Sequence, residues 1–262
     1  MTTDVVIGGA AGIGKAVAGT FAGRGPLIVA DRDTGGARAV ADELGAEAAE
    51  CDVTEPAQIE ALAARVDRLG VLAVTAGVSP QMAPGRVGYA VNLVGTARVL
   101  KTFERLVGPG TVTVCFSSTA GHALSPGEPI LEILDDPLAP DLIDRLEAAG
   151  IPVDNPTNAY SLAKLGVIRL VRHLAPAWGA RGGRILSVSP GVIETAMGQL
   201  GMQELPHLRE DIGNWPIARL GRAEEIASVV AFLCSDGASY MTGSDVLVDG
   251  GAVARLRDRR RE

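Results

Sequence analysis

The chain has 262 residues, a formal net charge of −7 and a pI near 5.1, so nucleic acid is not expected to be its main partner. It shows no charged segment followed by a short apolar core, and no run of about 18 apolar residues, which predicts neither secretion nor membrane insertion and therefore a cytoplasmic protein. Apolar residues make up 47% of the sequence but aromatic residues only 3%, as is typical of parallel sheets with cores of Ala, Val, Leu and Ile.

The first predicted elements are a strand, a glycine-rich turn and a helix. Residues 4–7 form a short apolar run, which leads into the pattern Gly8-x-x-x-Gly12-Ile13-Gly14 and then into a helical stretch over 15–22. This order brings backbone N–H groups and a helix N-terminus against a diphosphate, and glycine allows the phosphates to approach closely. A glycine turn without a ligand is the alternative interpretation.

The second predicted strand, over 26–30, ends at Asp31. This carboxylate lies 23 positions after Gly8, close to the distance of about 20 that is typical of an acidic residue binding the adenosine ribose. Such a carboxylate accepts hydrogen bonds from both ribose hydroxyls and repels a 2′-phosphate, which favours NAD over NADP. Arg32 beside it is able to neutralise a phosphate, and a solvated turn remains the alternative for Asp31.

The same alternation continues along the whole chain. Helices are predicted over 35–44, 56–69, 87–107, from before Tyr160 to about 178, and over 223–234; strands are predicted near 46–51, 71–75, 111–116, 184–188 and 245–248. Seven strands separated by helices predict one doubly wound (Rossmann) α/β domain over 1–262, with a sheet of parallel strands and helices on both faces.

Tyr160 and Lys164 lie four positions apart in one predicted helix, so their side chains share a face. An ammonium about 4 Å from the phenol contributes about 4 kcal/mol at an effective dielectric constant of about 20. This interaction would bring the pKa of the phenol close to neutrality, where an acid/base group works best. By itself the spacing is also common in solvated helices.

Candidate chemical residues follow the carboxyl ends of several predicted strands. They are Gly8, Asp31, Asp52, Gly77, Ser118 and Pro190. Open parallel sheets bind ligands in the crevice outside these ends, so the sequence predicts one common site. The three cysteines and three histidines have neither disulfide nor metal-ligand spacing, and no metal is expected.

Taken together, these motifs resemble those of the short-chain dehydrogenase/reductase family over nearly the whole chain. The matching residues are Gly8, Gly12, Ile13, Gly14, Asp31, Asp52, Ala76, Gly77, Asn92, Ser118, Tyr160, Lys164, Pro190, Gly191, Thr195 and the final Asp249-Gly250-Gly251. The chain departs from the family at Ile7, where threonine is usual, and at Thr75, where asparagine is usual; both departures predict weaker local rigidity. Within the family it resembles most the bacterial 3α-hydroxysteroid dehydrogenase/carbonyl reductases.

The resemblance implies an oxidoreductase that interconverts a secondary alcohol and a ketone. Tyr160 would exchange a proton with the substrate oxygen, Lys164 would lower the tyrosine pKa and hold the nicotinamide ribose, and Ser118 would bind the substrate oxygen. Asn92 would bend its helix and hold a proton-carrying water. Implied cofactor-binding residues are Gly8, Gly12, Ile13, Gly14, Asp31, Arg32, Asp52, Val53, Ala76, Gly77, Tyr160, Lys164, Pro190, Gly191, Ile193 and Thr195.

Substrate identity stays open at this point. A substrate loop is expected over about 193–216, with the apolar residues Met197, Leu200, Met202, Leu205 and Trp215, which suits a hydroxysteroid or a similar apolar carbonyl. Acyl thioesters, polyols and terpenoids are alternatives, as is a non-catalytic nicotinamide-binding module. The basic tail over 255–262 is expected to be a solvated end.

A segment of 41 residues, 119–159, separates Ser118 from Tyr160 and is far longer than the usual family spacer. Its apolar spacing predicts two short helices within an insert over about 122–156, divided by Pro137 and Pro140 and ended at Gly150. Many family members form tetramers through the tyrosine helix and its predecessor. An insert covering that surface predicts a homodimer through the helix over 223–234 and the last strand; a mobile lid on an ordinary tetramer is the alternative.

Overall fold

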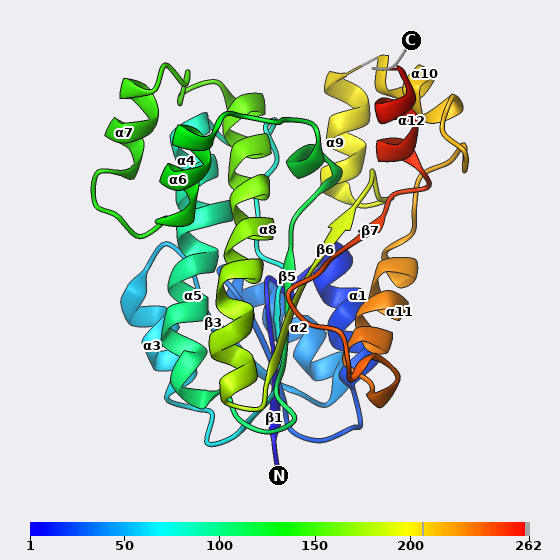
Figure 1. Cartoon of the computed structure of the whole chain (residues 1–262). Helices are drawn as coiled ribbons and strands as arrows, with labels where there is room; N and C mark the ends of the chain where they lie inside the picture. Colours follow the sequence, from blue (N-terminus) through cyan, green and yellow to red (C-terminus); the bar gives the residue numbers. More distant parts are fainter. Residues whose placement is uncertain (206, 260–262) are drawn as a thin grey trace.

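In the computed structural model, which describes residues 1–205 and 207–259, seven parallel strands form one sheet in the order β3-β2-β1-β4-β5-β6-β7. Figure 1 shows the sheet in the middle of the molecule with helices on either side. The strands are β1 (Thr3–Ile7), β2 (Leu27–Asp31), β3 (Glu47–Glu50), β4 (Leu69–Val74), β5 (Val112–Phe116), β6 (Arg184–Pro190) and β7 (Asp245–Val248). The order reverses between β1 and β4, which places the topological switch point beside the glycine turn. The predicted doubly wound sheet is confirmed.

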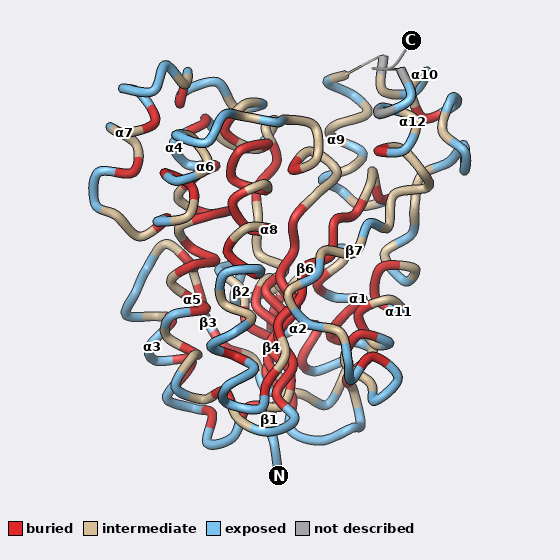
Figure 2. Tube along the Cα trace, viewed as in Figure 1, coloured by how far each residue is buried: buried red, intermediate tan, exposed pale blue. Residues whose placement is uncertain are grey.

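Helices cover both faces of this sheet, and the buried residues concentrate in its strands (Figure 2). One face carries α1 (Gly12–Phe21), α2 (Thr34–Leu44) and α11 (Ala223–Leu233); the other carries α3 (Pro56–Ala63), α4 (Gly85–Tyr89), α5 (Thr96–Phe103) and α8 (Pro156–Ala180). Both cores are mainly aliphatic, as the composition predicts. None of the helices among the described residues is long and apolar enough to cross a membrane.

Two predicted helices differ from the structure. The helix expected over 56–69 ends at Ala63, because Leu69 already pairs with Thr3 of β1 and belongs to the sheet. The helix expected over 87–107 runs from Gly85 to Leu106 but changes its winding twice. It contains a π-helical turn over Ala90–Gly95 and ends in a 3-10 turn, Glu104–Leu106. Apolar periodicity detects neither change.

The insert folds as two short helices, α6 (Glu128–Asp135) and α7 (Leu142–Ala148), as the spacing predicts. Helix α6 packs on α8, where its Asp135 accepts hydrogen bonds from Arg169. Helix α7 reaches α4 through an ion pair between Glu147 and Arg86. The insert therefore lies on the tyrosine-bearing helix and on the helix before it.

Two segments near the C-terminus are more helical than predicted. The expected substrate loop contains α9 (Ala196–Glu204) and α10 (His207–Gly213), and α12 (Ala252–Arg259) forms in the expected solvated tail. Val253 is 2% exposed, which anchors the start of α12 in the fold. Expectations for residues 260–262 lie outside the described residues.

Candidate active site

The glycine turn brings the start of α1 against the end of β1. A Cβ on Gly14 would lie 2.0 Å from the Gly8 carbonyl oxygen, and one on Gly8 would lie 2.4 Å from the Ala76 nitrogen, so both positions require glycine. Gly12 has φ +53 and faces Thr195, whose Cγ2 lies 3.3 Å from an added Cβ. Ala11, at the N-cap of α1, has no polar side chain to bind the first N–H groups of the helix. These donors fit a diphosphate.

Thr75 tightens the same turn. Its hydroxyl lies 2.8 Å from the carbonyl oxygen of Ile7 and 3.0 Å from that of Gly8, and it donates its proton to this pair. The turn therefore has a side-chain clamp from β4, although Ile7 and Thr75 depart from the family pattern. The Thr75 hydroxyl thus joins the ends of β1 and β4, while weaker local rigidity at these two positions stays a prediction.

Asp31 is fixed by the backbone on both sides of its carboxylate. One oxygen accepts from Ala10 N and the other from Asp33 N, each at 3.0 Å, which holds the carboxylate beside the glycine turn. Each oxygen keeps a lone pair for a ribose hydroxyl.

Asp52 ends the next strand in a turn of its own. Burial raises its pKa, but hydrogen bonds from Thr54 and the nearby Arg32 guanidinium outweigh it, and the pKa lies below its usual value. The Arg32 guanidinium thus helps to lower the pKa of the Asp52 carboxyl. Val53, which follows it, is 4% exposed and packs against Gly95 of the π-helical turn.

Asn92 lies in the π-helical turn and is completely buried. Its side-chain amide forms two hydrogen bonds of 3.0 Å with the main chain of Val78, one to the nitrogen and one to the oxygen. A Cβ on Gly77 would lie 2.9 Å from Asn92 Oδ1 and 3.4 Å from Lys164 Nζ. The strand end after β4 therefore packs directly on these two side chains.

Lys164 is 5% exposed, and its Nζ donates to the carbonyl oxygen of Phe116 at 2.9 Å. Burial lowers its pKa to about 8, since the charged form loses hydration. Nζ lies 5.7 Å from the centre of the Tyr160 ring. Burial raises the pKa of Tyr160, and its interaction with the Ser118 hydroxyl opposes that rise. The prediction that the Tyr160 pKa falls towards neutrality is therefore wrong for the protein residues by themselves. The Lys164 ammonium is hydrogen-bonded to Phe116, and its own lowered pKa makes it easy to deprotonate.

Ser118 follows β5 and caps a 3-10 turn over Thr119–His122. Its Oγ accepts a hydrogen bond from Ala120 N at 3.2 Å, which orients the hydroxyl. The preceding Ser117 donates to the carbonyl oxygen of Lys164 at 2.8 Å and so joins the end of β5 to α8. Ser118, Tyr160 and Lys164 thus lie together although they come from two elements.

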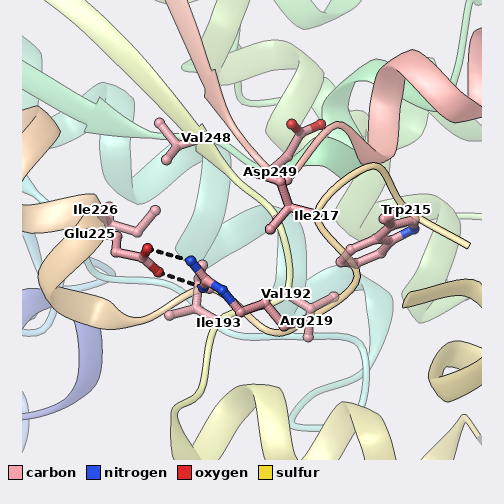
Figure 3. A pocket seen from close by; sticks show the side chains of 12 residues that line it. Val192, Ile193, Trp215, Ile217, Arg219, Glu225, Ile226, Val248 and Asp249 are labelled. Atoms are coloured by element: carbon pink, nitrogen blue, oxygen red, sulfur yellow. Dashed lines mark hydrogen bonds and ion pairs between the residues drawn. The ribbon is translucent and has the colours of Figure 1, made fainter. Parts of the chain in front are cut away.

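The loop after β6 completes the edge of the site. Pro190 ends β6 and Gly191 follows it, and Thr195 caps α9 by accepting a hydrogen bond from Gly198 N at 3.2 Å. Behind Val192 and Ile193 lies a cavity of about 120 Å³ (Figure 3), bordered by Trp215 and by the paired side chains of Arg219 and Glu225. The sequence does not predict this ion pair, because neither Arg219 nor Glu225 belongs to a motif.

Two family models and several known proteins match this sequence. Residues 3–130 match the family model described as short chain dehydrogenase, and residues 147–253 match the model described as enoyl-(acyl carrier protein) reductase. The 3-alpha-hydroxysteroid dehydrogenase/carbonyl reductase of Comamonas testosteroni is 30% identical, over 98% of both chains. The D-threitol dehydrogenase of Mycolicibacterium smegmatis is 31% identical, over 94% of this chain and 91% of the relative.

A solved structure supports the same fold. It is a 7α-hydroxysteroid dehydrogenase in complex with NADH and 7-oxo-glycochenodeoxycholic acid, 26% identical, with a TM-score of 0.75. The match covers 95% of this chain and 93% of that chain.

Proposed function

Because the chain belongs to the short-chain dehydrogenase/reductase family, we propose that it is an NAD(H)-dependent enzyme that interconverts a secondary alcohol and a ketone. The observation that carries the proposal is the buried Lys164 beside Tyr160 and Ser118, at the sheet edge where the glycine turn opens. A buried lysine is costly to keep in a fold, and such perturbed groups cluster at functional sites.

The residues present fit a nicotinamide dinucleotide. The uncapped start of α1 would bind the diphosphate, and Asp31 would accept the hydroxyls of the adenosine ribose. Asp52 and Val53 would border the adenine, while Ile193 and Thr195 would border the carboxamide. When bound, the nicotinamide supplies or accepts the hydride, and the protein contributes orientation and electrostatics.

Proton transfer falls to Tyr160. Its raised pKa keeps the phenol protonated at neutral pH, ready to donate to the oxygen of a ketone. Ser118 would hold that oxygen and stabilise the charge that develops on it. Lys164, with a pKa of about 8, would exchange protons near neutrality, and it would favour the phenolate that alcohol oxidation needs only while it is charged. Oxidation should therefore accelerate as the pH rises, and reduction as it falls.

For the substrate we favour a hydroxysteroid or a similar apolar ring carbonyl. Met197 on α9 is 36% exposed, and the neighbouring Leu200, Met202 and Trp215 are partly exposed on the segment that follows Thr195. Large apolar side chains left partly exposed beside a reaction site suit an apolar ligand. The D-threitol dehydrogenase relative supports a polyol as the second candidate.

A panel of secondary alcohols tests the proposal. Purified protein with NAD⁺ is offered a 3α-hydroxysteroid, a 7α-hydroxysteroid, cis-4-hydroxycyclohexanecarboxylate and D-threitol, and NADH absorbance is followed. The proposal predicts turnover of at least one ring alcohol, with kcat/KM higher than for D-threitol. The reverse order supports the polyol, and no turnover of any alcohol, together with measurable NADH binding, supports a non-catalytic module.

A further inference from the structure

A buried polar cluster joins the last strand of the sheet to the turn after β5. His122 Nε2 donates to Asp245 Oδ2 at 2.8 Å, and the other oxygen of Asp245 accepts from Ser187 at 2.6 Å and from Ser189 at 2.9 Å. The side chains of His122 and Asp245 are 14% and 4% exposed. These four residues belong to no motif of the proposed reaction.

The cluster fixes one point in the sheet. Ser187 and Asp245 are direct partners in the ladder between β6 and β7, and both serines are completely buried. With three donors on its two oxygens, the Asp245 carboxylate has little freedom to move. His122 is thus attached to a carboxylate that the two buried serines hold in place.

His122 is the last residue of the 3-10 turn that Ser118 caps. The turn is short, and Gly121 N donates to the Ser118 carbonyl oxygen at 2.9 Å, so a shift of His122 is transmitted to Ser118. On its other side the turn packs on α8, where a Cβ on Gly121 would lie 3.0 Å from the main chain of Lys164 and Leu165. The turn is therefore held between α8 and β7.

Stability alone gives little reason for such a pair. Burying an acid and a base costs hydration that their attraction barely offsets, and apolar residues of similar size commonly serve a fold as well. A directional hydrogen bond does fix the position of the group that it holds.

We propose that His122, anchored on Asp245, is a positioning residue that holds the Ser118 hydroxyl at the distance from Tyr160 that the reaction needs. This inference rests on the proposed function, in which Ser118 binds the substrate oxygen. His122 itself touches neither the substrate nor the cofactor in this assignment.

A double-mutant cycle of His122 and Ser118, with kcat as the measured quantity, tests the proposal. His122→Phe keeps a ring but removes the donor, and it should lower kcat by about 10- to 100-fold, as small misplacements of catalytic groups do. The Kd for NADH, measured by fluorescence, should stay within twofold of wild type. In the background of Ser118→Ala, the same substitution should lower kcat by less than threefold, because the group it positions is already gone. The substrate is the panel alcohol with the highest kcat/KM.

Two further variants complete the experiment. His122→Gln restores a donor near the place of Nε2 and should return kcat to within about fivefold of wild type. His173→Leu removes a histidine that also pairs with an aspartate, Asp135, but lies on the outer side of α8, and should leave kcat unchanged. If His122→Phe does not fold, His122→Leu takes its place in the cycle.

The outcomes separate this inference from the proposed function. A Ser118→Ala variant with wild-type kcat contradicts the catalytic role of Ser118, whatever His122 does. If Ser118→Ala lowers kcat, and the fold losses in kcat of the two single substitutions multiply in the double variant, the positioning role of His122 is wrong. A kcat of His122→Phe within threefold of wild type, or an equal loss of NADH affinity, also overturns it.

Discussion

Lys164 serves the proposed reaction but lowers the stability of the fold, because its charge is buried. Its pKa falls from 10.5 to about 8, which corresponds to a cost of about 3 kcal/mol for keeping the charge buried at neutral pH. Since the folded pKa is the lower one, the unfolded chain binds more protons between pH 8 and 10.5. The penalty is complete below about pH 8 and disappears as the pH rises through this window.

Lys164→Met should therefore make the protein more stable while abolishing its activity. At pH 7 we expect a gain of about 1–3 kcal/mol in the free energy of unfolding, reduced by the lost hydrogen bond to Phe116. The gain should shrink towards pH 10. Urea unfolding of both proteins at pH 7 and pH 10 measures it, and a wild-type protein that is the more stable one at pH 7 contradicts this account.

Asp31 should set the choice of cofactor. Its carboxylate is held by Ala10 N and Asp33 N, so it is not free to turn away from a 2′-phosphate, and like charges repel strongly at a partly desolvated site. We expect a higher kcat/KM with NAD(H) than with NADP(H). Asp31→Ser should reduce the ratio of these two kcat/KM values at least tenfold. A higher value with NADP(H) for the wild-type protein refutes the assignment.

At the scale of single residues, the sequence predicts which residues form the site better than it predicts their pKa values. Tyr160, Lys164 and Ser118 follow from spacing and from their place after strands, and the structure brings them together. The pKa of Tyr160 does not follow, because it depends on burial and on where the ammonium of Lys164 finds its acceptor. The pairing of His122 with Asp245, 123 positions apart, leaves no local pattern at all.

At the scale of elements, the first turn of α1 leaves no room for a side chain at Gly14. Gly14→Ala would place a methyl group 2.0 Å from the Gly8 carbonyl oxygen, whereas a Cβ on Gly19 in the same helix meets nothing within 4 Å. We expect Gly14→Ala to weaken NADH binding at least tenfold and to destabilise the protein. Gly19→Ala should be neutral or stabilising by about 0.5–1 kcal/mol.

Fluorescence titration with NADH and thermal unfolding compare these two variants directly. Equal NADH affinity for Gly14→Ala and Gly19→Ala would show that close packing of the glycine turn does not shape the cofactor site.

Elements with a strong apolar period are predicted well from the sequence. The seven strands and both helices of the insert lie where the pattern places them. The end of α3 and the π-helical turn at Asn92 do not follow, since one depends on pairing with β1 and the other on a single extra residue in a helical turn. The helices α9 and α10 do not follow either, because the apolar residues of this segment also fit a substrate-binding loop.

For the whole molecule we propose a homodimer. The insert lies on α8 and is tied to it by Arg169 and Asp135, on the surface that many family members use to form tetramers. Phe232 on α11 is 50% exposed and Leu247 on β7 is 37% exposed, which leaves apolar side chains on the other candidate surface.

Phe232→Glu should convert this dimer into a monomer, since it places a charge in an apolar contact. Val87→Glu on α4, where the side chain is 42% exposed near the insert, serves as the control and should remain dimeric. Light scattering of the wild-type protein and both variants gives the answer. A wild-type tetramer that contacts through α8 would refute the dimer and favour the insert as a mobile lid.

The most direct test of the whole account is a comparison of the wild-type protein and Tyr160→Phe on the same secondary alcohol with NAD⁺. The substitution keeps the ring beside Lys164 and removes only the hydroxyl that exchanges the proton. We expect kcat to fall by at least about 10²–10⁴-fold while the Kd for NADH stays within about threefold. Turnover of Tyr160→Phe within tenfold of wild type would contradict the proposed chemistry.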